Sequence, residues 1–192
     1  MPTRDTLLEE TARLYAEHGW RGTTTRRIAE AAGVNEVTIF RQFGSKEALL
    51  VQAIQQAAKD SDVHWLPELP KRLRPELHRW ALAQHAMLCE KRGLIRACLA
   101  ESEQRPDLAP LACEGGLIVF ADLVRYLRVA RRKGLIGRGG SVEAAAGLLL
   151  NAVFMDAMMR EAMPQAHPYT VAHGFDLFID LILRGLGAGE TA

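Results

Sequence analysis

Side chains that could read the bases of DNA are gathered in one short segment of the chain. Residues 36 to 43 have helical periodicity, with Ile39 and Phe43 four apart on a side that must be buried. A small exposed hydrophobe among hydrogen-bonding groups suits the major groove, where base edges and the thymine methyl group are the targets. The outward residues of this segment are Glu36, Val37, Thr38, Arg41 and Gln42.

Positive charge is concentrated in the same part of the chain. The whole sequence has a formal net charge of only +1, which taken alone argues against a general polyanion binder. Between Trp20 and Lys46, however, five basic residues face two acidic ones, which gives this stretch a charge of +3. Thr24 and Thr25 stand at the start of a predicted helix, where hydroxyl and backbone N–H groups can hold a phosphate oxygen. The sequence therefore predicts a basic surface that faces DNA.

Two short helices joined by a glycine turn must position these side chains. The pattern predicts a helix over Thr25–Ala32, a turn at Gly33 that needs a positive φ angle, and a second helix that Asn35 caps. This is the geometry of a helix-turn-helix. Helices this short are marginal alone. We therefore expect them to pack on a first helix that ends near Gly19 and on a fourth that Ser45 caps.

The rest of the chain also has helical spacing, and no segment alternates apolar and polar residues over the length of a strand. We therefore expect an all-α fold. Prolines between residues 61 and 75 mark a joint between two regions. Beyond the joint, the sequence predicts helices over residues 75–91, 94–103, 107–133, 141–161 and 168–184.

The N-terminal segment closely resembles the DNA-binding domain of the TetR family of bacterial transcriptional regulators. The resemblance rests on the string GWRGTTTRRIAEAAGV at residues 19–34 and on TIFRQFGSKEAL at residues 38–49, where caps, turn and core positions agree together. It implies a three-helix helix-turn-helix domain at residues 1–50. It also implies a larger helical domain at residues 51–192 that binds a small-molecule effector and forms a homodimer.

The resemblance implies roles for individual residues of the reading surface. Arg26 matches the family's base-contacting arginine, and Glu36 and Val37 occupy base-reading positions. Glu36 repels phosphate but could accept a hydrogen bond from the N4 amine of cytosine. The phosphate-contacting positions are held by Thr25, Thr38 and Lys46.

Two positions depart from the family pattern. Phe40 stands where a tyrosine hydroxyl usually meets phosphate, so Phe40 can only pack. Gln42 stands where an aromatic residue or histidine is common, and it could hydrogen-bond to phosphate or base. Asn35 is interpreted as a helix cap, and the alternative is that it reads a base. The full set of DNA-binding candidates is Thr24, Thr25, Arg26, Asn35, Glu36, Val37, Thr38, Phe40, Arg41, Gln42 and Lys46.

Bulky apolar side chains recur at helical spacing in the larger region. Taken singly, each is expected to form plain core, whereas the family resemblance implies a cavity among them for an effector. Methionine and aromatic side chains suit an uncharged or weakly polar molecule, and Gln84, Asn151 and Asp156 could orient it. The ligand-binding candidates are Trp65, Trp80, Gln84, Met87, Phe120, Leu123, Asn151 and Met155.

The last two predicted helices are too apolar to stand uncovered. Residues 144–150 form an unbroken run of Ala, Gly and Leu, and the last helix carries an apolar stripe that includes Phe175, Ile179 and Leu183. Such helices fit a homodimer in which the pair meets its copy as a four-helix bundle. Packing within the monomer alone is the alternative.

The predicted helix over residues 107–133 has two unusual features. Gly115 and Gly116 lie in its interior, where they indicate a kink or a close helix approach. Basic residues cluster near its end, where they favour the helix dipole. We expect them to be solvated, with a second nucleic-acid surface as the alternative. The cluster consists of Arg125, Arg128, Arg131, Arg132 and Lys133.

Other function classes find little support in the sequence. The first 20 residues have no apolar core, and the apolar stretch of residues 144–159 is shorter than a membrane span, so we expect a cytoplasmic protein without a membrane partner. The three cysteines form no C-x-x-C pair and suit a reducing compartment. We expect no enzyme and no cofactor; His85 and Cys89 alone make a poor metal site. A regulator that answers to a protein partner and a helical enzyme or scaffold remain alternatives.

Overall fold

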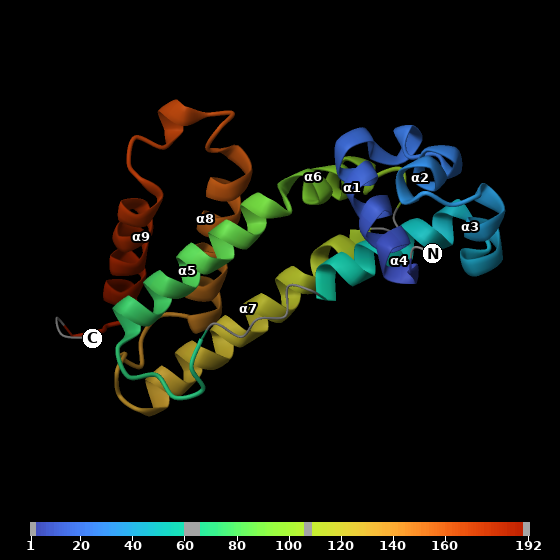
Figure 1. Ribbon diagram of the computed structural model, residues 1–192. Helices are drawn as coiled ribbons and strands as arrows, with labels where there is room; N and C mark the ends of the chain where they lie inside the picture. The colour runs from blue at the N-terminus through green and yellow to red at the C-terminus, as the bar shows by residue number, and fades with distance from the viewer. Residues whose placement is uncertain (1–2, 60–65, 106–108, 190–192) are drawn as a thin grey trace. The chain divides into compact units, whose positions relative to one another are not determined.

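The computed structural model describes residues 3–59, 66–105 and 109–189, and within these ranges it is helical without strands (Figure 1). The predicted all-α class is therefore confirmed. The helices are α1 (Arg4–Gly22), α2 (Thr25–Ala32), α3 (Glu36–Phe43), α4 (Lys46–Lys59), α5 (Leu73–Glu90), α6 (Arg92–Glu101), α7 (Ala109–Arg132), α8 (Val142–Met159) and α9 (Val171–Gly185), with a short 3-10 helix at Pro164–Ala166.

The chain forms two compact units, which we call the head and the body. The head comprises residues 1–62 and 91–116, and the body comprises residues 63–90 and 117–192. The boundary predicted at residue 50 lies within α4, and the first division between the packed units falls between residues 62 and 63. Leu50 and Ile54 of α4 are buried in a cluster with Tyr15 of α1 and Cys98 of α6. This cluster explains why all of α4, together with α6, belongs to the head.

A small core holds α2 and α3 in the head. Eight-residue helices are marginal in water, and each of these two buries one side against α1 and α4. Ile28, Ile39 and Leu49 are fully buried. The remaining buried apolar members of this core are Leu7, Leu8, Leu14, Ala29, Ala32, Phe43 and Ala53. The burial of this apolar side leaves the opposite side of α3 to solvent.

The predicted caps at Asn35 and Ser45 and the predicted turn at Gly33 are confirmed, and Thr24 forms a further cap. The side chains of Thr24, Asn35 and Ser45 accept hydrogen bonds from backbone N–H groups at the starts of α2, α3 and α4. Gly33 ends α2 in the left-handed conformation, with φ 65° and ψ 35°. Gly19 has a φ of 63° and interrupts α1, which ends at Gly22 and so runs three residues beyond the end expected near Gly19. These local signals set the helix-turn-helix geometry.

Polar contacts tie α6 into the head. The Tyr15 hydroxyl donates to the Ala97 carbonyl at 3.2 Å, and Lys91 Nζ donates to the Ala57 carbonyl at 2.6 Å. Burial raises the pKa of Tyr15 and raises the pKa of the Cys98 thiol to about 11. Both groups are therefore neutral at physiological pH, and Cys98 acts as a small hydrophobe.

In the body, α5 packs against both α8 and α9. Trp80, Tyr126 and Phe175 are the largest buried side chains there. The buried carboxylate of Glu76 accepts from the Tyr126 hydroxyl at 2.7 Å and from the N–H groups of residues 71 and 72. Burial alone raises the pKa of Glu76, but these hydrogen bonds outweigh it and lower that pKa. The charge of Glu76 is thus stabilised at the start of α5.

Among the described helices, α8 alone is long and apolar enough to cross a membrane by length and composition. The core helix of a globular protein has the same properties. Here α8 packs on α5 and α9, and it buries the charged Asp156 in the body. Both observations favour a core helix.

The glycine pair of α7 makes no close helix approach. A Cβ atom added at Gly115 or Gly116 would meet no atom within 4 Å. Helix α7 is continuous through both residues. Neither glycine is therefore required by packing or by a positive φ angle, in contrast to Gly33.

The same substitution should have opposite effects at Gly33 and Gly115. Gly33→Ala forces a Cβ into the left-handed region and should lower the free energy of unfolding by about 1 kcal/mol. Gly115→Ala replaces a poor helix former in open space and should raise it by up to about 1 kcal/mol. Urea unfolding at one fixed protein concentration measures both. A shift of the two variants in the same direction contradicts this account.

Candidate functional site

The outward face of α3 lies at the surface of the head. Val37 is 70% exposed and Phe40 is 49% exposed. Arg41 and Gln42 are also exposed, and Thr38 is partly buried. A contiguous face of α3 can thus approach a ligand without unfolding the head core.

Arg26 extends from the first turn of α2 into solvent. Its side chain is 81% exposed, and its Nε donates to Glu30 one helical turn away at 3.0 Å. This hydrogen bond raises the pKa of Arg26, so the guanidinium stays charged. An exposed pair of this kind contributes little stability, so Arg26 can exchange Glu30 for a base or phosphate at small cost.

Two of the DNA-binding candidates act first as helix caps. The Thr24 hydroxyl oxygen accepts from the Arg27 N–H at 3.2 Å, and the Asn35 side-chain oxygen accepts from the Val37 N–H at 3.0 Å. The predicted interpretation of Asn35 as a cap is confirmed. Because capping uses the acceptor atoms, the Thr24 O–H and the Asn35 NH₂ remain donors that face outward.

Thr25 and Glu36 are joined by a hydrogen bond that the sequence did not indicate. The Thr25 hydroxyl donates to Glu36 Oε2 at 2.9 Å. The bond connects the first residue of α2 with the first residue of α3. A hydroxyl has a single hydrogen to donate. In this arrangement the Thr25 side chain therefore cannot also donate to phosphate, the role that the family resemblance implies.

The Lys46 side chain contacts Trp20, another residue of the head. Its Nζ donates to the Trp20 carbonyl at 2.6 Å and lies 5.0 Å from the centre of the Trp20 ring, while the Arg105 guanidinium lies 3.4 Å from the same ring centre. Burial lowers the pKa of Lys46. Lys46 therefore has a structural contact in addition to its predicted one with phosphate.

The ligand-binding candidates of the body fall into two groups. Trp80, Gln84 and Leu123 are buried in the body, and Met87 and Phe120 are partly buried. Asn151 and Met155 lie exposed on α8, so the structure does not bring them together with the buried group. Trp65 lies outside the described residues. Sequence periodicity could not make this division, because α8 is apolar nearly all round.

Gln84 is a polar residue in the interior of the body. Its residue is 3% exposed. Buried amides are normally paired because an unpaired one costs about 1–3 kcal/mol. A carboxamide carries both a donor and an acceptor, so it can pair with a polar group of a ligand.

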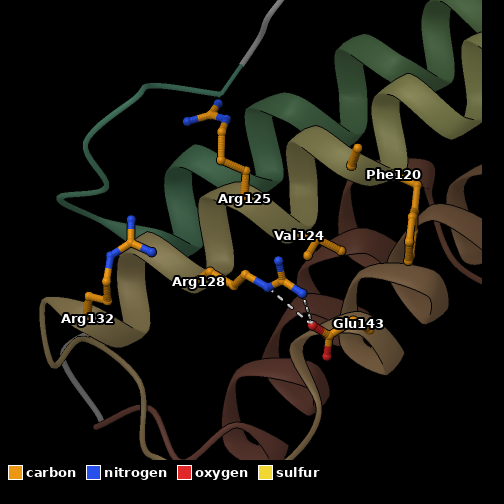
Figure 2. Close-up of a pocket in the computed structure, with 7 residues that line it drawn as sticks. Phe120, Val124, Arg125, Arg128, Arg132 and Glu143 are labelled. Carbon is orange, nitrogen blue, oxygen red and sulfur yellow. Dashed lines mark hydrogen bonds and ion pairs between the residues drawn. The ribbon is translucent and has the colours of Figure 1, made fainter.

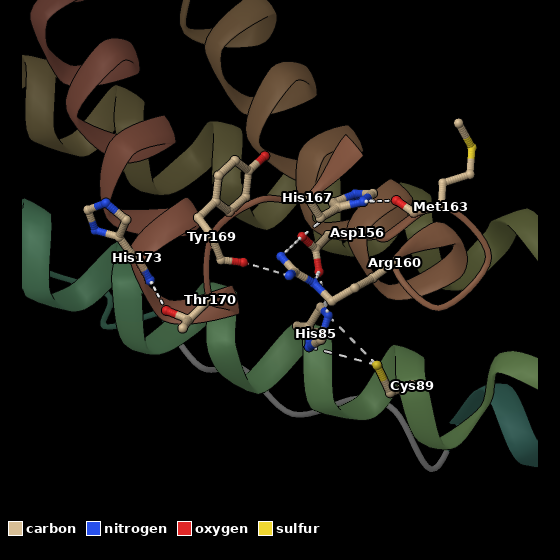
Figure 3. A network of polar contacts seen from close by, with 9 residues as sticks. All are labelled: His85, Cys89, Asp156, Arg160, Met163, His167, Tyr169, Thr170 and His173. Atoms are coloured by element: carbon tan, nitrogen blue, oxygen red, sulfur yellow. Dashed lines mark hydrogen bonds and ion pairs between the residues drawn. The ribbon is translucent and has the colours of Figure 1, made fainter. Parts of the chain in front are cut away.

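Asp156, by contrast, is engaged by its own neighbours (Figure 3). The carboxylate is 2% exposed and accepts from Arg160 at 2.6 and 2.9 Å, with His85 Nε2 at 2.9 Å. Burial raises the pKa of Asp156, but the Arg160 hydrogen bonds and nearby positive charge outweigh it and lower that pKa. Asp156 is thus committed to the fold of the body and not left to orient a ligand.

The same network fastens the loop after α8. Arg160 also donates to the Tyr169 carbonyl at 2.7 Å.

The Cys89 sulfur lies 3.7 Å from both ring nitrogens of His85, which places it beside the ring and not in line with either nitrogen. Among the described residues, no group of three or more His, Cys, Asp or Glu side chains is arranged to hold a metal ion.

A hollow of about 410 Å³ lies open to solvent beside α7 and the start of α8 (Figure 2). Its apolar part includes Phe120 and Val124, and its basic residues are Arg125, Arg128 and Arg132. Arg128 is paired with Glu143 at 2.7 Å.

The basic cluster at the end of α7 is only partly solvated, contrary to our expectation. Arg131 donates to three backbone carbonyls between Gly137 and Gly140, and Lys133 donates to the Pro70 carbonyl. These two residues therefore stabilise the neighbouring loops.

Four large apolar side chains are exposed on α8 and α9, and we call them the apolar patch. Leu148 is 65% exposed and Leu181 is 67% exposed, and both belong to the helices predicted to form a dimer. Met155 and Leu177 are also exposed large hydrophobes on these two helices. Large exposed apolar residues grouped in this way mark interaction surfaces.

Comparison with known sequences finds a family similarity in the first part of the head. The family model for bacterial regulatory proteins of the tetR family matches residues 7–53. YvkB of Bacillus subtilis, an uncharacterised HTH-type transcriptional regulator, is 28% identical over 148 residues, which cover 75% of this chain and 76% of YvkB. AcnR of Corynebacterium glutamicum, an HTH-type transcriptional repressor, is 44% identical over 62 residues, which cover 32% of this chain and 33% of AcnR.

Solved structures extend the similarity over nearly the whole chain. A TetR-family transcriptional regulator from Mesorhizobium loti has a TM-score of 0.81 at 20% identity, with 96% of both chains covered. GusR of Salmonella enterica has a TM-score of 0.76 at 25% identity, with 95% of this chain and 96% of GusR covered. The similarity in fold therefore includes the body.

Proposed function

The chain belongs to the TetR family of bacterial regulatory proteins, and from this premise we propose that it is a repressor that binds a palindromic DNA operator as a homodimer. A small, largely apolar effector bound in the body releases the operator. No observation on the described residues favours a protein partner as the signal, or an enzyme or scaffold. The protein acts in the cytoplasm, where its DNA is.

The outward face of the helix-turn-helix is the observation that carries the proposal. Arg26, Val37 and Arg41 are exposed on two helices whose opposite sides form the head core. Helix α3 has the length and exposure to enter a major groove, while donors at the helix starts hold phosphates. Repression is supported by the similarity to AcnR, which is a repressor.

The patch on α8 and α9 supports the homodimer. A two-fold dimer uses the same surface on both subunits, and two pairs of helices can bury such a patch as a four-helix bundle. The two recognition helices would then enter successive major grooves, about 34–36 Å apart on DNA. This symmetry is the reason for proposing a palindromic operator.

Gln84 supports an effector site in the body. Its side chain is buried in the same unit as Trp80 and Leu123, with Met87 and Phe120 partly buried. These surroundings suit an apolar molecule with one hydrogen-bonding group. Such a molecule releases the operator only if it prefers the state that does not bind DNA.

Arg26→Ala should weaken operator binding about tenfold or more, because a base-contacting arginine contributes about 1–3 kcal/mol. The operator is first obtained by selecting bound sequences from random DNA, and affinity is then measured by fluorescence anisotropy. Arg13→Ala is the matched control, since Arg13 is a half-exposed arginine of α1 paired with Glu10 and Glu17. An Arg26→Ala affinity equal to that of Arg13→Ala would remove Arg26 from the reading face.

Charge placed on the patch should separate the homodimer. Leu148→Glu combined with Leu181→Glu buries two carboxylates per subunit in the proposed interface, so the variant should sediment as a monomer at micromolar concentration. Leu69→Glu makes the same change at a leucine that is 61% exposed outside α8 and α9, and it should remain dimeric. A monomeric wild-type protein, or a dimeric double variant, excludes this interface.

Gln84→Leu should make any compound that releases wild-type protein from the operator less effective, because it removes the buried carboxamide at nearly constant volume. Gln165→Leu, at an exposed position of the body, is the matched control and should leave the response unchanged. Fluorescence anisotropy with the labelled operator measures the release, and urea unfolding checks that both variants are folded. A response of Gln84→Leu equal to that of the wild type would remove Gln84 from the effector site.

A further inference from the structure

The hydrogen bond between Thr25 and Glu36 gives the reading face a preference for one base. We propose that Glu36, held in place by Thr25, selects cytosine at one position in each operator half-site. The inference rests on the proposed DNA-binding function and adds a specificity-determining residue and a positioning residue to it.

The two residues meet where two helices begin. Thr25 opens α2 and Glu36 opens α3, and the hydroxyl of the first donates to Oε2 of the second at 2.9 Å. Glu36 is partly buried, whereas the next residue, Val37, is 70% exposed. The bond restricts the rotamers of a flexible side chain before DNA arrives. Less conformational entropy is then lost when the carboxylate meets a base.

A carboxylate on this face is costly unless a base pairs with it. It repels the phosphates that the neighbouring arginines attract, so it lowers affinity for DNA in general. Glu36 stands in the first turn of α3, where the N-terminal end of a helix attracts a carboxylate, and its charge interacts with that of Arg26. An ionised carboxylate is an acceptor only. The lone pairs of Glu36 that do not accept from Thr25 therefore need a hydrogen-bond donor in the major groove.

The major-groove edges of the four bases decide which donor it finds. Guanine presents two acceptors and thymine presents one, so both repel a carboxylate. Adenine presents the N6 amine beside the acceptor N7, whereas cytosine presents the N4 amine without an acceptor. Cytosine is therefore the base that an acceptor-only side chain prefers.

Thr25 acts through Glu36 and not on the DNA. Its hydroxyl hydrogen is already donated to the carboxylate, so its side chain cannot donate to a phosphate oxygen at the same time. Loss of this hydroxyl should relax the choice of base at one position. Loss of a phosphate contact would instead weaken binding to all sequences alike.

Selection from random double-stranded DNA, carried out with full-length wild-type protein and three variants, tests the proposal. The wild type should enrich cytosine at one position of each half-site. Glu36→Gln should enrich adenine there, because a carboxamide can pair with both N6 and N7 of adenine. Thr25→Val should reduce the cytosine preference at this position roughly fivefold or more, and Thr25→Ser should keep it. Circular dichroism confirms that each variant is folded.

The outcomes separate this proposal from the DNA-binding function. If wild-type protein selects a sequence but Glu36→Gln selects the same one, the base assignment is overturned while DNA binding stands. If Glu36→Gln only tightens binding to all sequences, Glu36 merely repels phosphate and the proposal also fails. A Thr25→Val profile equal to that of the wild type removes the positioning role. If the wild type binds no DNA, the proposed function itself fails.

Discussion

The structure of the head depends on one constraint: two eight-residue helices cannot persist unless each buries one side. Ile28 of α2 and Ile39 of α3 are fully buried, and this burial against α1 and α4 decides which side of each helix faces solvent. The hydrophobic contribution comes from the inner side, so the outer side is free to carry residues chosen for recognition. Among the described residues, the hydrogen bond between Thr25 and Glu36 joins the outward sides of α2 and α3.

The head also depends on residues from the middle of the chain. Trp20 is contacted by Lys46 on α4 and by Arg105 just after α6, so three segments are joined by one aromatic ring.

The chain passes from body to head between residues 90 and 91, and back to the body between residues 116 and 117. Gly115 and Gly116 directly precede the second passage, and a Cβ atom at either would meet none of the described atoms within 4 Å. Because glycine is a poor helix former, the pair weakens the interior of α7 at this point.

Features that depend on local chemistry could be predicted from the sequence, whereas features that depend on which helices meet could not. The limits of α2 and the caps at Asn35 and Ser45 follow from propensity and hydrogen bonding within a few residues, and these predictions are confirmed. The inclusion of α6 in the head depends on contacts between residues more than 80 positions apart, such as Tyr15 with Ala97.

The candidate sites show the same division, because partners distant in sequence decide the state of each polar group. Asp156 has the sequence appearance of a ligand-orienting group, but His85, 71 residues away, and Arg160 engage it. The local charge of +3 already subtracts Glu30, which pairs with Arg26, but it overstates what phosphate meets because the Trp20 carbonyl also holds Lys46. Because the attraction to phosphates in general is weak, the contacts with bases must discriminate between DNA sequences. In a two-fold dimer each such contact occurs twice, and the free energies of separate positions add. A fivefold preference in each half-site thus becomes about 25-fold over a palindrome.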